Sequence, residues 1–164
     1  MFTTENYISI LKINLEKNSV NLIRNIKEIL NLNYYNEIEI LDFTVYIQPF
    51  ELSIMMFSMD KEANEVFYEG NDSKIYAGSL EILGDIEYFD LQDDKVDEFW
   101  EFFEQNDKII SKGEEQTILE WFVDCWKKAK GESIKLPVYF CFHDDDKSFD
   151  LINMEWISDE GKWI

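Results

Sequence analysis

The sequence contains few of the residues that usually reveal a disulfide framework, a cofactor or a flexible linker. Among its 164 residues there are two cysteines, two prolines, six glycines and one histidine. Cys125 and Cys141 each lie within an apolar run, so we interpret both as small core residues rather than as a disulfide pair. The scarcity of proline and glycine predicts regular elements joined by few loops. A chain of this length without a linker is expected to form a single domain over residues 1–164.

The single histidine restricts the catalytic arrangements that the chain can form. A nucleophile activated by histidine would have to use His143, and Cys141 lies two residues away on the same strand face, where side chains run parallel rather than converge. The sequence has no glycine-rich phosphate loop and no G-x-S-x-G motif. Among its 35 acidic residues no carboxylate pair stands out for glycoside hydrolysis. We therefore expect a protein that is not an enzyme and needs no cofactor.

Basic residues are also scarce, with 15 Lys and Arg against 35 Asp and Glu, a formal net charge of −20. Binding to nucleic acid or to an anionic membrane depends on Lys and Arg, so we expect neither. A basic protein or metal ions would be attracted, or the charge only keeps an aromatic-rich protein soluble. No apolar run approaches the ~20 residues of a membrane span, and the N-terminus has no signal-peptide pattern. We expect a soluble, cytoplasmic protein.

Apolar residues make up 46% of the chain and aromatic residues 16%, which is enough for a substantial core. Helical spacing of apolar residues predicts a helix over residues 4–33 that is broken at Lys17-Asn18-Ser19. Alternating apolar residues predict strands at residues 38–47, 52–57, 66–68, 74–77 and 80–89. A hairpin loop is predicted at residues 60–64, between the second and the third of these strands.

Two helices and a strand pair are predicted in the second half of the chain. Residues 93–106 and a segment from Glu114 onward have helical spacing, and Lys112-Gly113 is interpreted as the break between them. The stretch Leu136–Ile157 follows as a hairpin with a return strand at residues 148–152, and it is expected to share the core with the tryptophan-rich helix before it. This order of elements predicts an α+β fold, an antiparallel sheet with helices packed on one face.

Acidic residues are concentrated between residues 81 and 107, where eleven Asp and Glu stand against the single Lys95. Like charges at helical three- and four-residue steps destabilise a helix by roughly 0.2–0.5 kcal/mol per pair, and a solvated face usually mixes both signs. We therefore interpret one such row, the acidic stripe, as a docking surface for a basic partner, with a plain solvated face as the alternative. Phe99, Trp100 and Phe103 fit the core side of the same helix. The acidic stripe consists of Asp94, Asp97, Glu98, Glu101 and Glu104.

A second acidic group, Asp144, Asp145 and Asp146, lies at the turn of the predicted hairpin, and we include it in the candidate partner-binding surface. Positions 144, 146, 148, 150 and 155 also have the spacing of oxygen ligands in a calcium loop. Phe149 replaces the glycine that such a loop needs, and the flanks are predicted as strands rather than helices. The main interpretation is therefore a hairpin turn, for which Asp is well suited. His143 with these acids is an alternative site for a transition metal, but a lone histidine without a second histidine or a cysteine pattern favours an ordinary surface histidine.

In size, acidity, aromatic richness and order of elements, the chain resembles the small acidic immunity proteins encoded beside polymorphic toxins in Gram-positive bacteria. The passages that carry the resemblance are the helix ILEWFVDCWKKA and the strand pair LPVYFCFHDDDKSFDLI. The resemblance implies an intracellular protein that binds a cognate toxin, often a basic nuclease, and blocks it by occlusion. We therefore expect a basic protein partner, bound through the acidic face. A calcium-binding module and an enzyme of unrecognised type are the alternatives.

Overall fold

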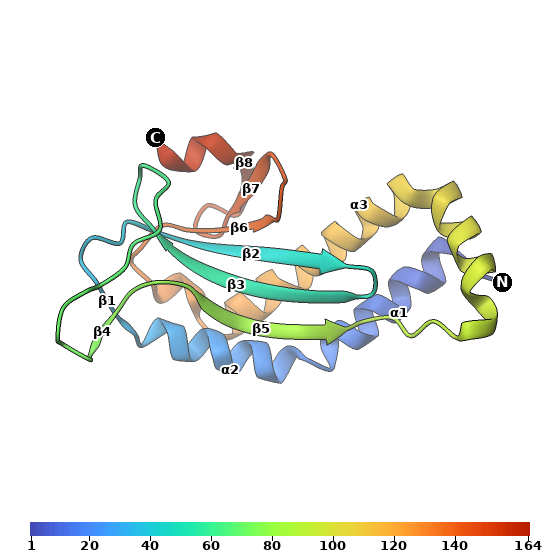
Figure 1. The fold of residues 1–164 in the computed structure, drawn as a ribbon, viewed down its shortest axis with the longest axis horizontal. Coiled ribbons are helices and arrows are strands. Elements are labelled where there is room, and N and C mark those ends of the chain that lie inside the picture. Colours follow the sequence, from blue (N-terminus) through green and yellow to red (C-terminus); the bar gives the residue numbers. More distant parts are fainter.

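Eight strands form the β-structure of the chain, in a computed structural model that describes residues 1–164 (Figure 1). They are β1 (Asn33–Tyr34), β2 (Ile40–Gln48), β3 (Glu51–Met59), β4 (Ile75–Tyr76), β5 (Leu80–Glu87), β6 (Val138–Phe142), β7 (Lys147–Asp150) and β8 (Glu155–Ser158). Six of them make one sheet in the order β5-β3-β2-β6-β7-β8, while β1 and β4 form a small parallel pair. Within the large sheet only the central pair is parallel, with Leu41 of β2 opposite Val138 of β6.

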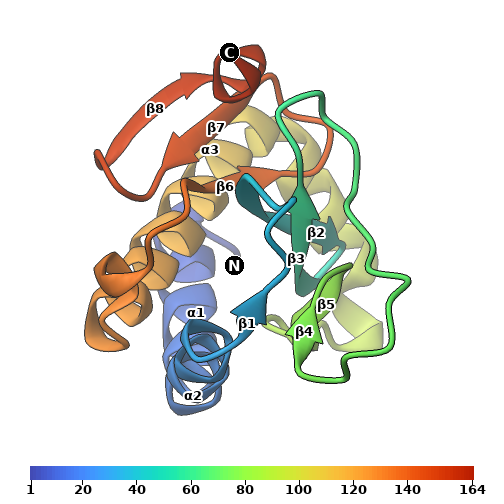
Figure 2. The same ribbon diagram turned by 90° about the vertical axis from the view of Figure 1, so that its left-hand side faces the viewer.

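Three α-helices pack against one face of the sheet, so the predicted α+β class is confirmed (Figures 1 and 2). They are α1 (Thr4–Glu16), α2 (Ser19–Leu30) and α3 (Val96–Lys128), and three short 3-10 segments complete the chain, η1 (Asp93–Lys95), η2 (Gly131–Ser133) and η3 (Asp159–Trp163). The break between α1 and α2 falls at the predicted residues. None of the helices combines the length and the apolar character that crossing a membrane would require.

The predicted break at Lys112-Gly113 is wrong, because α3 continues through both residues. A Cβ atom on Gly113 would lie 2.9 Å from the Cδ1 atom of Ile8, so the glycine allows α1 to pack closely against α3. The helix bends instead at Asn106, where φ is −126° and ψ is 16°. The side-chain amide of Asn106 donates to the carbonyl of Phe102 at 2.8 Å, which offers the backbone a local alternative to regular helical bonding.

The predicted hairpin at residues 60–64 is present only as its turn. A single antiparallel bridge joins Met59 to Glu65 across it, but residues 66–68 form no strand, so the predicted strand pairing is wrong. The partners of β3 are β2 and β5, and the turn from β2 to β3 is made by Pro49 and Phe50. Proline followed by a residue with positive φ, here 70° at Phe50, is the pattern of a type II turn. A two-residue turn of this kind brings the two strands into pairing directly.

The strand pair near the C-terminus contains one strand more than predicted. The return strand β7 ends at Asp150 rather than at residue 152, because the carboxylate of Asp150 accepts the backbone N–H groups of Ile152 and Asn153 at 2.9 and 3.0 Å. This Asx turn reverses the chain into β8, which forms one edge of the sheet. The C-terminal residues then return over the sheet as η3 (Figure 2).

One core of 33 buried residues connects the helices to the sheet. At its centre the ring of Phe122 on α3 lies 4.6 Å from Phe140 of β6 and 5.2 Å from Phe43 of β2, measured between ring centroids. Trp126, one turn further along α3, is 1% exposed and packs edge-on against Phe43. The prediction that the tryptophan-rich helix and the Leu136–Ile157 hairpin share the core is therefore confirmed.

Candidate functional site

All five residues of the acidic stripe are exposed on η1 and the first part of α3. Glu98 is the only one in an ion pair, since Lys95 lies 3.5 Å and the N-terminal amine 3.9 Å from its carboxylate oxygens. These groups are about half exposed or more, so the pairs contribute little. Asp97 and Glu98 also benefit from the positive end of the helix dipole, but Glu101 and Glu104 lie beyond the first turn. The stripe therefore carries uncompensated negative charge.

Trp100 is more exposed than the sequence pattern predicts. Phe99 is fully buried and Phe103 partly buried, but the Trp100 residue keeps 36% of its surface accessible. Residues three and four apart are neighbours on a helix surface, so Trp100 lies beside Asp97 on one side and Glu104 on the other. Its ring contacts Phe50 of the β2–β3 turn at 5.9 Å between centroids. An aromatic side chain thus borders the acidic stripe.

A cavity of about 280 Å³ opens beside Trp100, between α1, residues of α3 on both sides of its bend, the β2–β3 turn and the residue that follows β5. We call it the aromatic pocket. The lining contains no Lys, Arg or His side chain, while two carboxylates, Glu114 and Glu115, contribute to it. Its aromatic and acidic lining includes Tyr7, Phe50, Tyr88, Trp100, Phe103 and Glu114.

Glu114 is a buried carboxylate at this pocket, with 7% of its surface exposed and no ion-pair partner. Its Oε2 atom accepts the hydroxyl of Tyr88 at 2.8 Å and that of Tyr7 at 3.4 Å. Burial raises the pKa of Glu114, and burial together with the nearby Glu114 charge raises the pKa of both tyrosines. Sequence reasoning missed this residue, although an acid between Ile110 and Ile118 at four-residue steps interrupts an apolar stripe and could have indicated it.

The raised pKa of Glu114 predicts that the protein loses stability as the pH rises. A group whose pKa is higher in the folded state stabilises the fold fully below its unfolded pKa, and this contribution disappears as the pH passes the folded-state pKa. We expect urea unfolding to show a smaller free energy at about pH 8 than at about pH 5, and Glu114→Gln to reduce that difference. Glu120→Gln, which removes an exposed charge from the same helix, is the control. Equal pH dependence in both variants would contradict the prediction.

The second acidic group lies apart from the stripe, in the turn between β6 and β7. Asp145 and Asp146 border a hollow that also includes Glu115 and Lys112 of α3, well beyond the bend at Asn106. Burial, and then the charge of Asp145, raises the pKa of Glu115. Glu115 lines both this hollow and the aromatic pocket. The structure does not bring Asp144–Asp146 into contact with the stripe.

The residues with calcium-loop spacing do not converge. Ser148 is buried and donates its hydroxyl to Asp159 at 2.6 Å, while the carboxylate of Asp150 is occupied by its own turn. No group of three or more acidic, His or Cys residues in the structure is arranged to hold a metal ion. Residues 143–146 form the turn between β6 and β7, as the main interpretation of the sequence predicts.

His143 and Cys141 are not paired with each other. The ring of His143 lies 4.6 Å from the ring of Tyr46, and its Nε2 atom is 3.3 Å from the carboxylate of Asp144. Cys141 is buried, with its sulfur 3.6 Å from the Thr44 hydroxyl and 3.7 Å from Asp42. Burial, followed by the charge of Asp42, raises the pKa of the Cys141 thiol to about 11, so the reactive thiolate is scarce at neutral pH.

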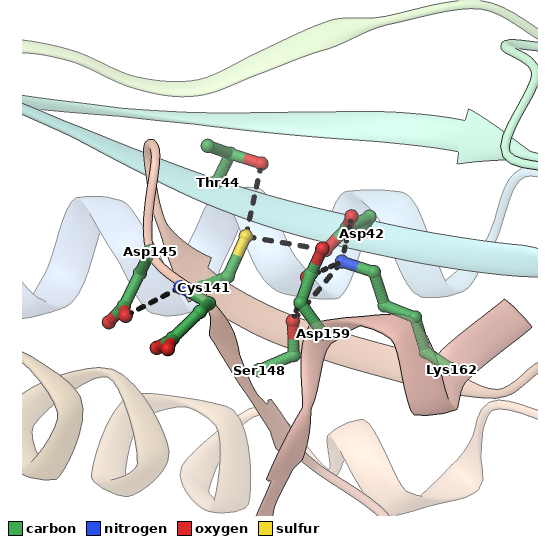
Figure 3. A network of polar contacts seen from close by, with 8 residues as sticks. Asp42, Thr44, Cys141, Asp145, Ser148, Asp159 and Lys162 are labelled. Atoms are coloured by element: carbon green, nitrogen blue, oxygen red, sulfur yellow. Dashed lines mark hydrogen bonds and ion pairs between the residues drawn. The ribbon is translucent and has the colours of Figure 1, made fainter.

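A buried ionic network occupies the sheet face opposite the helices (Figure 3). The amine of Lys162 on η3 lies 2.7 Å from Asp42 of β2 and 2.7 Å from Asp159, and it donates to the Ser148 hydroxyl at 3.1 Å. Burial alone would lower the pKa of Lys162, but the two carboxylates raise it. Sequence reasoning missed the network, although an acid inside the apolar run of β2 was a usable signal. The network attaches the C-terminal segment to the sheet.

No family model matches the chain, and no curated protein or solved structure matches it significantly.

Proposed function

We propose that the protein is a non-enzymatic binding protein that recognises a basic protein through the acidic stripe and blocks it by occlusion. The observation that carries the proposal is the row of exposed, largely unpaired carboxylates on the first part of α3, bordered by the accessible ring of Trp100. The resemblance to immunity proteins makes a basic toxin, such as a nuclease, the expected partner.

Two physical steps make such a surface effective. The charge of −20 and the stripe attract a cationic partner over long distances, which raises the association rate and makes it sensitive to salt. After encounter, aromatic side chains supply most of the binding free energy, and tryptophan is among the residues most often dominant at interfaces. Trp100 is positioned for this step because it lies between Asp97 and Glu104 on the helix surface. In Figure 1 this part of α3 lies at one end of the molecule, near the N-terminus.

The proposal is tested by reversing the charge of the stripe in the triple variant Asp97→Lys, Glu98→Lys and Glu101→Lys. We expect the tagged protein to capture a basic partner from the source cell, and the triple variant to bind that partner with an association rate lower by about 10- to 1000-fold. The measurement is surface-based kinetics with the captured partner at two salt concentrations.

A matched variant separates the position of the charges from their number. Glu28→Lys, Glu62→Lys and Glu69→Lys change the net charge equally but lie on α2 and in the β3–β4 connection, and all three residues are exposed. This control should keep most of the affinity, and both variants should unfold at similar urea concentrations. If the two triple variants weaken binding equally, or neither does, the acidic stripe is not the binding surface.

A further inference from the structure

We propose that the aromatic pocket receives one arginine side chain of the basic partner, stacked on the aromatic surface formed by Trp100 and its neighbours, with the guanidinium directed at Glu114. This inference rests on the proposed function for the source of the arginine. The pocket itself is defined by the geometry of α1, α3, the β2–β3 turn and the residue that follows β5.

A carboxylate without a charge partner lies at the base of the pocket. Glu114 is 7% exposed and forms no ion pair, and no Lys, Arg or His lines the pocket, so an entering cation would supply the partner that stabilises its ionised form. Both tyrosine hydroxyls donate to Oε2, whereas Oε1 accepts no hydrogen bond and is not sealed inside the protein. One carboxylate oxygen is therefore available to a donor that enters the pocket.

The walls of the pocket are largely aromatic. Trp100, Phe103 and Phe50 line it together with the buried side chains of Tyr7 and Tyr88. Trp100 and Phe103 lie edge to face at 5.5 Å, and Phe50 lies 5.9 Å from Trp100, so these rings form a continuous aromatic surface. Aromatic faces attract cations, and a planar guanidinium also stacks on them, which a compact ammonium cannot do. Arginine is thus favoured over lysine.

The size of the pocket also fits a single side chain. Pockets for drug-sized ligands and cofactors usually measure about 300–1,000 Å³. The aromatic pocket, at about 280 Å³, lies just below this range, and it is open to solvent at a partly exposed tryptophan. A single long side chain presented by a protein surface suits this volume better than a cofactor. The acidic stripe next to the opening would concentrate basic chains there.

The test has a first part that does not need the partner. Nα-acetyl-argininamide is titrated into the ¹⁵N-labelled protein, and the indole N–H signal of Trp100, assigned with Trp100→Phe, is followed by NMR. We expect saturable shifts with a dissociation constant on the order of millimolar, much weaker shifts with the neutral isostere Nα-acetyl-citrullinamide, and loss of binding in Glu114→Gln. Glu120→Gln should behave as the unaltered protein. Equal shifts with both compounds, or none with either, would overturn the assignment of an arginine site.

The second part uses the captured partner and distinguishes this inference from the proposed function. Trp100→Ala and Glu114→Gln should each raise the dissociation constant roughly tenfold, mainly through faster dissociation, while the salt dependence set by the stripe is retained. If the stripe reversal weakens binding and these two variants do not, the proposed function stands and the pocket inference is wrong. If argininamide binds in the first part but no partner depends on the stripe, the proposed function fails, and with it the assignment of the arginine to a protein.

Discussion

Replacing Lys162 with methionine is expected to lower the free energy of unfolding by about 3–5 kcal/mol, the usual cost of removing one member of a buried ion pair. The lysine side chain is 2% exposed, and the carboxylates of Asp42 and Asp159 both lie 2.7 Å from its amine. Methionine preserves much of the length of the side chain but leaves the carboxylates of Asp42 and Asp159 without their cation, on the sheet face opposite the helices. Urea unfolding with linear extrapolation measures the difference.

Lys128→Met provides the matched control for burial. Lys128 forms a pair of nearly the same length with Asp124, 2.8 Å, but both side chains are about 60% exposed. Its removal should cost less than about 1 kcal/mol. The double variant Asp42→Asn with Lys162→Met should recover part of the loss, because it removes one of the unpaired charges. Similar losses in the two methionine variants would show that the network contributes no more than a surface pair.

Phe122→Ala should lower the free energy of unfolding by a similar amount, about 3–5 kcal/mol. The ring is fully buried between Phe43 of β2 and Phe140 of β6, at the point where α3 meets the middle of the sheet. For a chain of this size the midpoint of thermal unfolding should fall by roughly 6–20 °C. Calorimetry or circular dichroism measures this shift.

The control for Phe122 is Ile109→Ala on the same helix, since Ile109 is 64% exposed. Its substitution should change the stability by no more than about 0.5 kcal/mol. A small effect at Phe122 would mean that the surrounding rings can close the space left by the phenyl group, and that the core is less rigidly packed than its centroid distances indicate.

Much of the fold could be predicted because periodicity is a local signal. The break at Lys17-Asn18-Ser19 and the Trp126 helix follow from apolar residues at three- and four-residue steps, and β2 follows from alternation. Gly113 was misread because its role depends on Ile8, more than a hundred residues earlier in the chain. Residues 66–68 alternate like a strand, but β2 and β5 occupy the two edges of β3.

The candidate site also has one part that is local in the sequence and one part that is not. The acidic stripe was predictable because its members share one helix and neighbour one another by regular geometry. The aromatic pocket was not, because Tyr7, Tyr88 and Glu114 come from three separate parts of the chain and meet only in the folded structure. A buried acid on an apolar helix face indicates that some polar partner must exist, but not which residue supplies it.

The parallel pairing of β2 with β6 has a consequence for the order of folding during synthesis. The strands β2, β3 and β5 follow one another closely and can pair as soon as they leave the ribosome, whereas about 90 residues, including all of α3, separate the end of β2 from β6. At the usual speed of translation β2 would keep an unpaired apolar edge for roughly 5–20 s. The nascent chain therefore passes through a stage at which it is open to intermolecular strand addition, and the arrival of Val138–Phe142 ends that stage.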